Sequence, residues 1–234
     1  MTPILVFMGI LAAIMIWWLA RHRIASKPWM EVGLTSAGID RGGAAPPTAK
    51  IGMGVFLAVV GALFSLLTSA YFMRMNASDW WAMPVPWLLW VNTAVLAANS
   101  VAIQWAAVSA RRGQHESVRI GLVGSFVLGG AFLAGQLLVW RQLVDTGYLL
   151  TTNPANSFFY LITGLHGLHI VGGLVGLVRT TAHAYDGSDA RSLRLGVDLC
   201  AMYWHFMFFV WLVLLALFSG YASDFVEICR QLVT

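Results

Sequence analysis

The chain has few charged residues. Only 10% of its 234 residues are Asp, Glu, Lys or Arg, whereas a soluble domain usually carries about 25%. With 11 Trp, 13 Phe and 59% hydrophobic residues, a water-soluble fold would expose large apolar patches. The composition excludes an ordinary soluble domain and predicts a protein that is surrounded by lipid.

Cysteine is also scarce, with Cys200 and Cys229 as the only two. They lie near opposite ends of the last apolar stretch. Because a helix rises about 1.5 Å per residue, roughly 30 Å or more should separate them. A disulfide needs Cα atoms within about 7 Å, so no internal bridge is expected. Two thiolates are also too few for an all-cysteine zinc or iron–sulfur site.

Acidic residues are missing from the interiors of the apolar stretches. None of the ten Asp and Glu lies well inside one, and Asp198 lies at an edge. Proton relays and ion-coupled transporters need buried ionisable groups, and di-iron bundles need inward-facing Glu. There is no phosphate-binding Gly-Lys-Ser/Thr loop, and a net charge of +4 does not indicate nucleic-acid binding.

Long apolar runs are what the sequence does contain. A spanning helix needs roughly 20 mostly apolar residues, and six stretches qualify. We therefore predict an all-α, polytopic membrane bundle of about six transmembrane helices. Residues 1–50 hold the first helix and a linker, and residues 51–234 hold a five-helix domain. The six stretches cover residues 4–20, 51–73, 85–109, 119–140, 157–179 and 198–220.

The basic residues alternate between the two sides of the predicted bundle. Eleven of the fourteen Lys and Arg fall in residues 21–50, 110–119 and 179–195. The positive-inside rule makes these segments cytoplasmic. Both termini are then periplasmic in a bacterial inner membrane. The first stretch is read as a retained helix rather than a signal peptide, because its basic residues follow it.

Three histidines lie within the apolar stretches: His166, His169 and His205. His166 and His169 are three residues apart and share one helix face, so they cannot ligate one haem from opposite sides. Three roles stay open: hydrogen bonds between helices, contact with lipid head groups or water, and a metal or haem site. We favour the first, which stabilises a membrane bundle by about 0.6–2 kcal/mol, and expect the histidines to join the fifth and sixth helices.

Small and polar residues follow the same helical spacing. Gly173 and Gly176 continue the stripe of His166 and His169, and small residues let membrane helices approach closely. This stripe is either a docking surface for a partner helix or ordinary packing within the chain. Interhelical hydrogen bonds explain the polar residues of the spans better than a polar pathway does. These residues are Asn92, Asn99 and Gln136.

Basic residues at the cytoplasmic edge have two possible roles. Each could attract an anionic lipid head group, worth about 1 kcal/mol near the surface, or simply set the topology. The residues concerned are Arg111, Arg112, Arg179 and Arg194.

Two strings resemble a known family. Residues 157–173, Ser-Phe-Phe-Tyr-Leu-Ile-Thr-Gly-Leu-His-Gly-Leu-His-Ile-Val-Gly-Gly, closely resemble the Thr-Gly-x-His-Gly-x-His signature of cytochrome c oxidase subunit III. Tyr203-Trp204-His205-Phe206 resembles that family's last-helix motif. The resemblance runs from about residue 50 to 222 and is to the short bacterial form, here with an extra N-terminal helix.

The sequence departs from the family where the family usually has membrane carboxylates. Val60, Val139 and Phe208 occupy those positions. These losses argue against a part in proton uptake and indicate a divergent branch.

The resemblance implies an accessory, non-redox subunit of a haem–copper terminal oxidase. Haem and copper would lie in partner subunits I and II, and this chain would bind no metal but would hold structural phospholipid. Its site residues would be structural, lining a lipid cleft: His166, His169, Gly173, Gly176, Trp204 and His205. Alternatives are a component of a nitric oxide reductase or quinol oxidase complex, a mono-haem membrane cytochrome b and a small-molecule transporter.

Overall fold

Five long helices make up the described part of the chain. The computed structural model describes residues 48–75, 77–81, 83–186 and 190–220, and contains no strand within these ranges. All five helices are long and apolar enough to cross a membrane, which confirms five of the six predicted spans. The sixth, residues 4–20, and the linker up to residue 47 lie outside the described residues. The helices are α2 (Thr48–Met75), α3 (Leu88–Arg111), α4 (His115–Asp145), α5 (Pro154–Tyr185) and α6 (Ala190–Phe218).

Four of the five helices are longer than the apolar stretches that predicted them, and α3 is about as long as its stretch. The five helices contain between 24 and 32 residues, or about 36 to 48 Å at 1.5 Å per residue. Arg119, Arg179 and Arg194, expected in loops, therefore lie inside α4, α5 and α6. Apolar composition marks only the lipid-facing part of a helix, whereas the backbone hydrogen bonds continue into the polar layer.

Short turns set the neighbours of each helix. Gly113, with φ of 72°, lies between α3 and α4, and this left-handed conformation suits glycine. At the other end of the bundle, the Asn153 side chain accepts a hydrogen bond from the Ala155 N–H at 3.1 Å. This caps α5, whose first residue is Pro154. The Asn153 amide also donates to the Trp81 carbonyl at 2.6 Å, which ties the α2–α3 and α4–α5 connections together.

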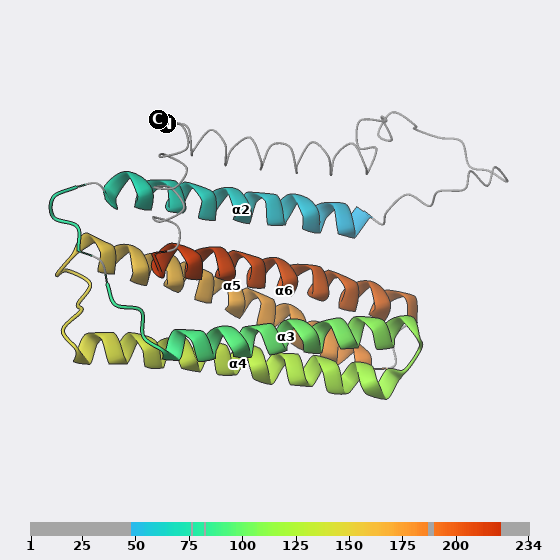
Figure 1. Ribbon diagram of the computed structural model, residues 1–234. Helices are drawn as coiled ribbons and strands as arrows, with labels where there is room; N and C mark the ends of the chain where they lie inside the picture. The colour runs from blue at the N-terminus through green and yellow to red at the C-terminus, as the bar shows by residue number, and fades with distance from the viewer. Residues whose placement is uncertain (1–47, 76, 82, 187–189, 221–234) are drawn as a thin grey trace, which may run out of the picture.

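Four helices form a ring, and the fifth lies outside it. α3 packs on α4 and α6, and α5 also packs on α4 and α6. α2 packs mainly on α5 and α6, at the edge of the bundle (Figure 1). In its most apolar part, 17% of α2 is buried inside the structure, whereas the corresponding share of the other four helices is 33% to 56%. α2 is thus the least enclosed helix and α6 the most enclosed.

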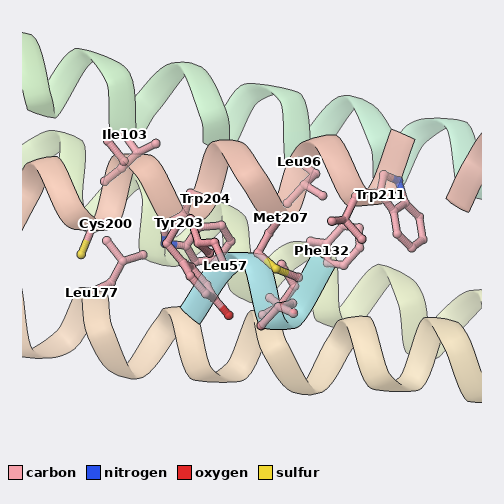
Figure 2. Close-up of a cluster of buried hydrophobic side chains, with 14 of the residues drawn as sticks. Leu57, Leu96, Ile103, Phe132, Leu177, Cys200, Tyr203, Trp204, Met207 and Trp211 are labelled. Carbon is pink, nitrogen blue, oxygen red and sulfur yellow. The ribbon is translucent and has the colours of Figure 1, made fainter. Parts of the chain in front are cut away.

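One side of α6 forms the centre of the core. Trp204, Met207 and Trp211 follow one another at spacings of three and four residues and are at most 1% exposed. Figure 2 shows them surrounded by Leu96 and Ile103 of α3, Phe132 of α4 and Leu177 of α5. The Phe132 and Trp211 rings meet edge to face with centroids 4.9 Å apart, a geometry worth about 0.5–1.5 kcal/mol beyond the area buried.

Glycine permits the close packing of α3 on α4. A Cβ atom at Gly121 would lie 2.8 Å from the Ala106 Cβ, and one at Gly135 would collide with the Asn92 side chain. Membrane helices associate largely through van der Waals contact, so small residues at a crossing allow more of it. The same close approach brings the polar side chains of the two helices within bonding distance.

Candidate functional site

The polar residues of α3 are bonded to α4. The Asn92 amide donates to Gln136 Oε1 at 3.2 Å, and the Ser125 hydroxyl donates to Asn99 Oδ1. All four side chains are at most 3% exposed. Each of these hydrogen bonds links α3 to α4, while Asn99 Nδ2 and Gln136 Nε2 have no partner among the described residues.

Two indoles add links that the sequence analysis missed. Trp140 Nε1 donates to the Thr163 hydroxyl at 3.2 Å, between α4 and α5. Trp211 Nε1 donates to the Thr93 hydroxyl at 2.9 Å, between α6 and α3. A buried indole N–H usually has a hydrogen-bond partner. The presence of Trp and Thr on neighbouring spans could therefore have predicted these two links.

His166 lies in an aromatic enclosure. Its side chain is completely buried, and its ring centroid is 6.1 Å from Phe64, 5.7 Å from Phe132 and 5.1 Å from Trp211. Neither ring nitrogen has a hydrogen-bond partner among the described residues. The imidazole thus contributes ring contacts to the junction of α2, α4, α5 and α6.

The other two histidines lie elsewhere. His169 Nδ1 donates to the Leu165 carbonyl of its own helix at 2.8 Å, and the His169 carbonyl accepts from the Tyr203 hydroxyl at 2.6 Å. His205 is exposed, with Nδ1 3.4 Å from the Ser100 hydroxyl of α3. The expectation that imidazole hydrogen bonds join α5 to α6 is therefore wrong: the His166 ring has no partner among the described residues, the His169 ring bonds its own helix, and His205 faces α3.

The predicted glycine stripe divides into two parts. A Cβ atom at Gly173 would lie 2.7 Å from the Tyr203 ring and 3.2 Å from the Trp204 ring, whereas one at Gly176 would meet nothing within 4 Å. Gly173 thus sets the approach of α5 to α6, and Gly176 does not. Trp204 fills the space between Gly173 and Gly129 of α4, and its Nε1 has no hydrogen-bond partner among the described residues.

A three-membered ion cluster joins α2, α3 and α6. Asp198, whose side chain is 12% exposed, accepts from Lys50 Nζ at 2.8 Å and from Arg111 Nη2 at 3.3 Å. We call this end of the bundle, where α2, α4 and α6 begin, the basic end. The sequence puts Asp198 at the edge of a predicted span, but spacing along the chain does not indicate that two cations from different helices share it.

Four other arginines of this end fall into two groups. Arg112, Arg179 and Arg194 are exposed. Arg119 donates through Nε and Nη2 to the Ala184 carbonyl, at 3.0 and 2.9 Å, and its guanidinium lies 4.6 Å from the Tyr185 ring centroid. Beside Arg119 is an open groove of about 560 Å3, lined by Glu116, Arg119, Ile120, Val123, Gly124 and Tyr185.

The opposite end of the bundle, which we call the aromatic end, is held by rings. Tyr71 of α2 meets Trp80 at 4.8 Å, Phe158 at 5.9 Å and Phe218 at 6.0 Å, all edge to face. The charged pair at the aromatic end is exposed: the Arg74 guanidinium donates to the Asp79 carboxylate at 2.5 Å. This hydrogen bond holds the pKa of Asp79 below its ordinary value of 3.8.

Apolar side chains fill all three positions where the family usually carries carboxylates, and two of the three are buried. Val60 is 4% exposed and Val139 is fully buried, while Phe208 is partly exposed and packs against the core. Within the residues that the structure describes, no three His, Cys, Asp or Glu side chains lie close enough to hold a metal ion.

A sequence model of the family described as "Cytochrome c oxidase subunit III" matches residues 48–222. A "Probable cytochrome c oxidase subunit 3" of Nocardia farcinica is 30% identical over 181 residues, covering 73% of this chain and 87% of that protein.

Two further relatives are similar in extent. The protein of the same description from Mycobacterium tuberculosis is 32% identical over 178 residues, covering 72% of this chain and 86% of its own length. "Cytochrome c oxidase subunit 3" of Synechocystis is 30% identical over 178 residues, which cover 74% of this chain and 75% of that protein. With five spanning helices and a family match over most of its length, this chain is a multi-pass membrane protein that belongs to the cytochrome c oxidase subunit III family.

Proposed function

We propose that the chain is the accessory, non-redox subunit III of a respiratory haem–copper terminal oxidase. In this role it packs against subunit I, which with subunit II holds the haem and copper, and it stabilises the complex while oxygen is reduced to water. The proposal places the chain in a bacterial inner membrane with both termini periplasmic. The eleven-to-three division of Lys and Arg between the two sides supports this orientation.

The observation that carries the proposal is how the buried polar side chains are used. Asn92 and Asn99 are bonded to α4, and Trp211 is bonded to α3. These contacts hold helices together and gather no set of ligands or acid–base groups at one point. Such an interior suits a scaffold for a catalytic partner.

Lipid binding is the second part of the proposal. The groove at the basic end combines apolar walls at Ile120 and Val123 with the guanidinium of Arg119. An anionic head group beside Arg119, with an acyl chain along Ile120 and Val123, would satisfy both kinds of surface. The exposed Arg111, Arg112, Arg179 and Arg194 are the competing candidates for head-group contact.

Subunit depletion tests the accessory role. The oxidase is purified with and without this chain, and its haem spectrum and its activity during continuous turnover are compared. We expect the spectrum to stay unchanged and the working lifetime to shorten. A loss of haem in proportion to the loss of this chain would contradict the proposal and favour a mono-haem cytochrome b.

Phospholipid content tests the lipid site separately. The purified complex carrying Arg119→Gln should retain less anionic phospholipid than the wild-type complex, while Arg179→Gln should retain as much. Equal retention by both variants would remove the groove from the proposal and leave the scaffold role standing.

A further inference from the structure

The outer face of α2 is an apolar surface on the helix that the described structure encloses least. Large side chains along it are between 39% and 71% exposed, and they lie on the side of α2 away from α5 and α6. They are Val55, Val59, Leu63 and Leu66, whereas the neighbouring Phe56 stacks on Tyr203 of α6. Since only 17% of the most apolar part of α2 is buried, this helix has room for a further helix on its outer side.

Two small residues lie within that face. Ala58 and Ala62 are both exposed and four residues apart, whereas Gly61 points inward, where an added Cβ would lie 3.5 Å from the Phe206 ring. Two alanines at this spacing leave a shallow depression between larger side chains. In a membrane such a depression lets the backbone of a second helix approach.

The chain itself supplies an apolar segment that is joined to α2. Residues 4–20 form an uncharged stretch of spanning length, followed by Arg21 and connected to α2 through residues 21–47. Consecutive elements are usually neighbours in space. Two spans joined by a segment on one side of the membrane must run antiparallel. Residues 1–47 also precede the family match, which begins at residue 48.

The depths of the small residues agree between the two segments. Arg21 and Lys50 are the basic residues next to each apolar stretch, and Lys50 lies in the ion cluster at the basic end. Ala13 and Gly9 lie eight and twelve residues from Arg21, and Ala58 and Ala62 lie eight and twelve from Lys50. At about 1.5 Å per residue, both pairs lie roughly 12 and 18 Å from the basic edge.

We propose that residues 4–20 dock as an antiparallel helix on the outer face of α2, with Ala13 opposite Ala58 and Gly9 opposite Ala62. The docked helix covers Val55, Val59 and Leu66. It extends the subunit by one helix on the side opposite the α3–α4 pair. The other occupants of this face are a helix of a partner subunit and lipid, and the test separates them from the proposed one.

Disulfide trapping in the full complex tests the docking. Cys200 and Cys229 are replaced by Ala, a specific protease site is inserted at Gly42-Gly43, and pairs of cysteines are introduced. Membranes are oxidised and the linker is cut. The two fragments are then examined without reductant, because only a disulfide, which needs Cα atoms within about 7 Å, keeps them joined.

The expected result is specific to one face at one depth. Ala13→Cys with Ala58→Cys, and Gly9→Cys with Ala62→Cys, should leave most of the chain joined. Two matched controls place the second cysteine at similar distances from the basic end on other faces: Gly124→Cys in α4 and Gly176→Cys in α5. Trapping of Ala13→Cys with either control, or to a partner subunit, would overturn the proposal.

A second arm avoids cysteines altogether. After the linker is cut in mild detergent, the N-terminal fragment should stay with the rest of the complex. Ala58→Ile with Ala62→Ile should reduce its retention several-fold. The control is Ala70→Ile, which should not reduce retention. Ala70 is also exposed on α2, but in the proposed register it lies opposite residue 1, beyond the docked residues 4–20. Retention that is unchanged by the first pair would contradict the proposed contact.

Discussion

The two ends of the bundle are held by different chemistry. At the basic end, Lys50 and Arg111 share the carboxylate of Asp198, and Arg119 bonds to the end of α5. At the aromatic end, Tyr71 lies among Trp80, Phe158 and Phe218. The only charged pair described at that end, Arg74 with Asp79, is exposed.

The difference shows how a weakly enclosed helix is held at both ends. α2 carries Lys50 near its start and Tyr71 near its end, and these residues belong to the two clusters. The ion cluster is directional and is weakened by salt. The ring cluster depends on shape and is insensitive to salt. The two anchors can therefore be broken separately.

Loss of the ring anchor should have the largest effect. Tyr71→Ala removes a buried ring that touches α5, α6 and the α2–α3 connection, and truncating a buried aromatic residue typically costs about 3–5 kcal/mol. Thermal unfolding of the full chain in mild detergent should show a clear fall in midpoint. Tyr71→Phe keeps the ring contacts and serves as the control, and an equal fall in both variants would show that the hydroxyl matters more than the ring.

Loss of the ion anchor should have a smaller effect that depends on salt. Asp198→Asn removes the charge from its hydrogen bonds to the partly buried Lys50 and the exposed Arg111, which we expect to cost about 2 kcal/mol. The same unfolding assay at low salt and at about 1 M salt should show the difference shrinking, because exposed charges are screened over about 3 Å at that ionic strength.

A double variant identifies the source of that loss. Lys50→Met should cost stability in the wild-type chain and much less in the Asp198→Asn chain. If the two losses were simply additive, Lys50 and Asp198 would be energetically independent despite their 2.8 Å contact.

The exposed pair at the aromatic end should have the smallest effect, and that effect should depend on pH. The hydrogen bond from Arg74 lowers the pKa of Asp79 below 3.8 in the folded chain. The stabilisation from this hydrogen bond is therefore present at pH values above the pKa of Asp79 in the unfolded chain, which is near 4. It is lost as the pH falls through the lower pKa of Asp79 in the folded chain. The small difference in unfolding midpoint between wild type and Asp79→Asn should be present at pH 5 and smaller at pH 2.5. A difference of the same size at both pH values would show that the carboxylate charge is irrelevant.

The spans were predictable because apolar composition determines them directly. All five described helices coincide with predicted stretches, and each extends into flanking polar residues that the apolar criterion omits. The pairing of Asn92 and Asn99 with α4 was also predictable in kind, because buried amides seven residues apart on one face need partners on a neighbouring helix.

Other features depend on how the helices are rotated against one another, which spacing along one chain does not specify. His205 shares the apolar stretch of Trp204 yet faces α3, and Gly176 belongs to the stripe of Gly173 yet meets nothing. The Lys50–Asp198 pair joins residues 148 positions apart. Such contacts follow from tertiary packing.

The spacing of the two anchors has a consequence for how the protein sits in its bilayer. Asp198 and Phe218 are twenty residues apart on α6, or about 30 Å along the helix, and Lys50 and Tyr71 on α2 are about equally far apart. This length equals the hydrocarbon thickness of a typical membrane. The ion cluster therefore lies at one water boundary and the ring cluster at the other, so the bundle resists displacement along the membrane normal. A thinner or thicker bilayer would strain one anchor or the other through hydrophobic mismatch.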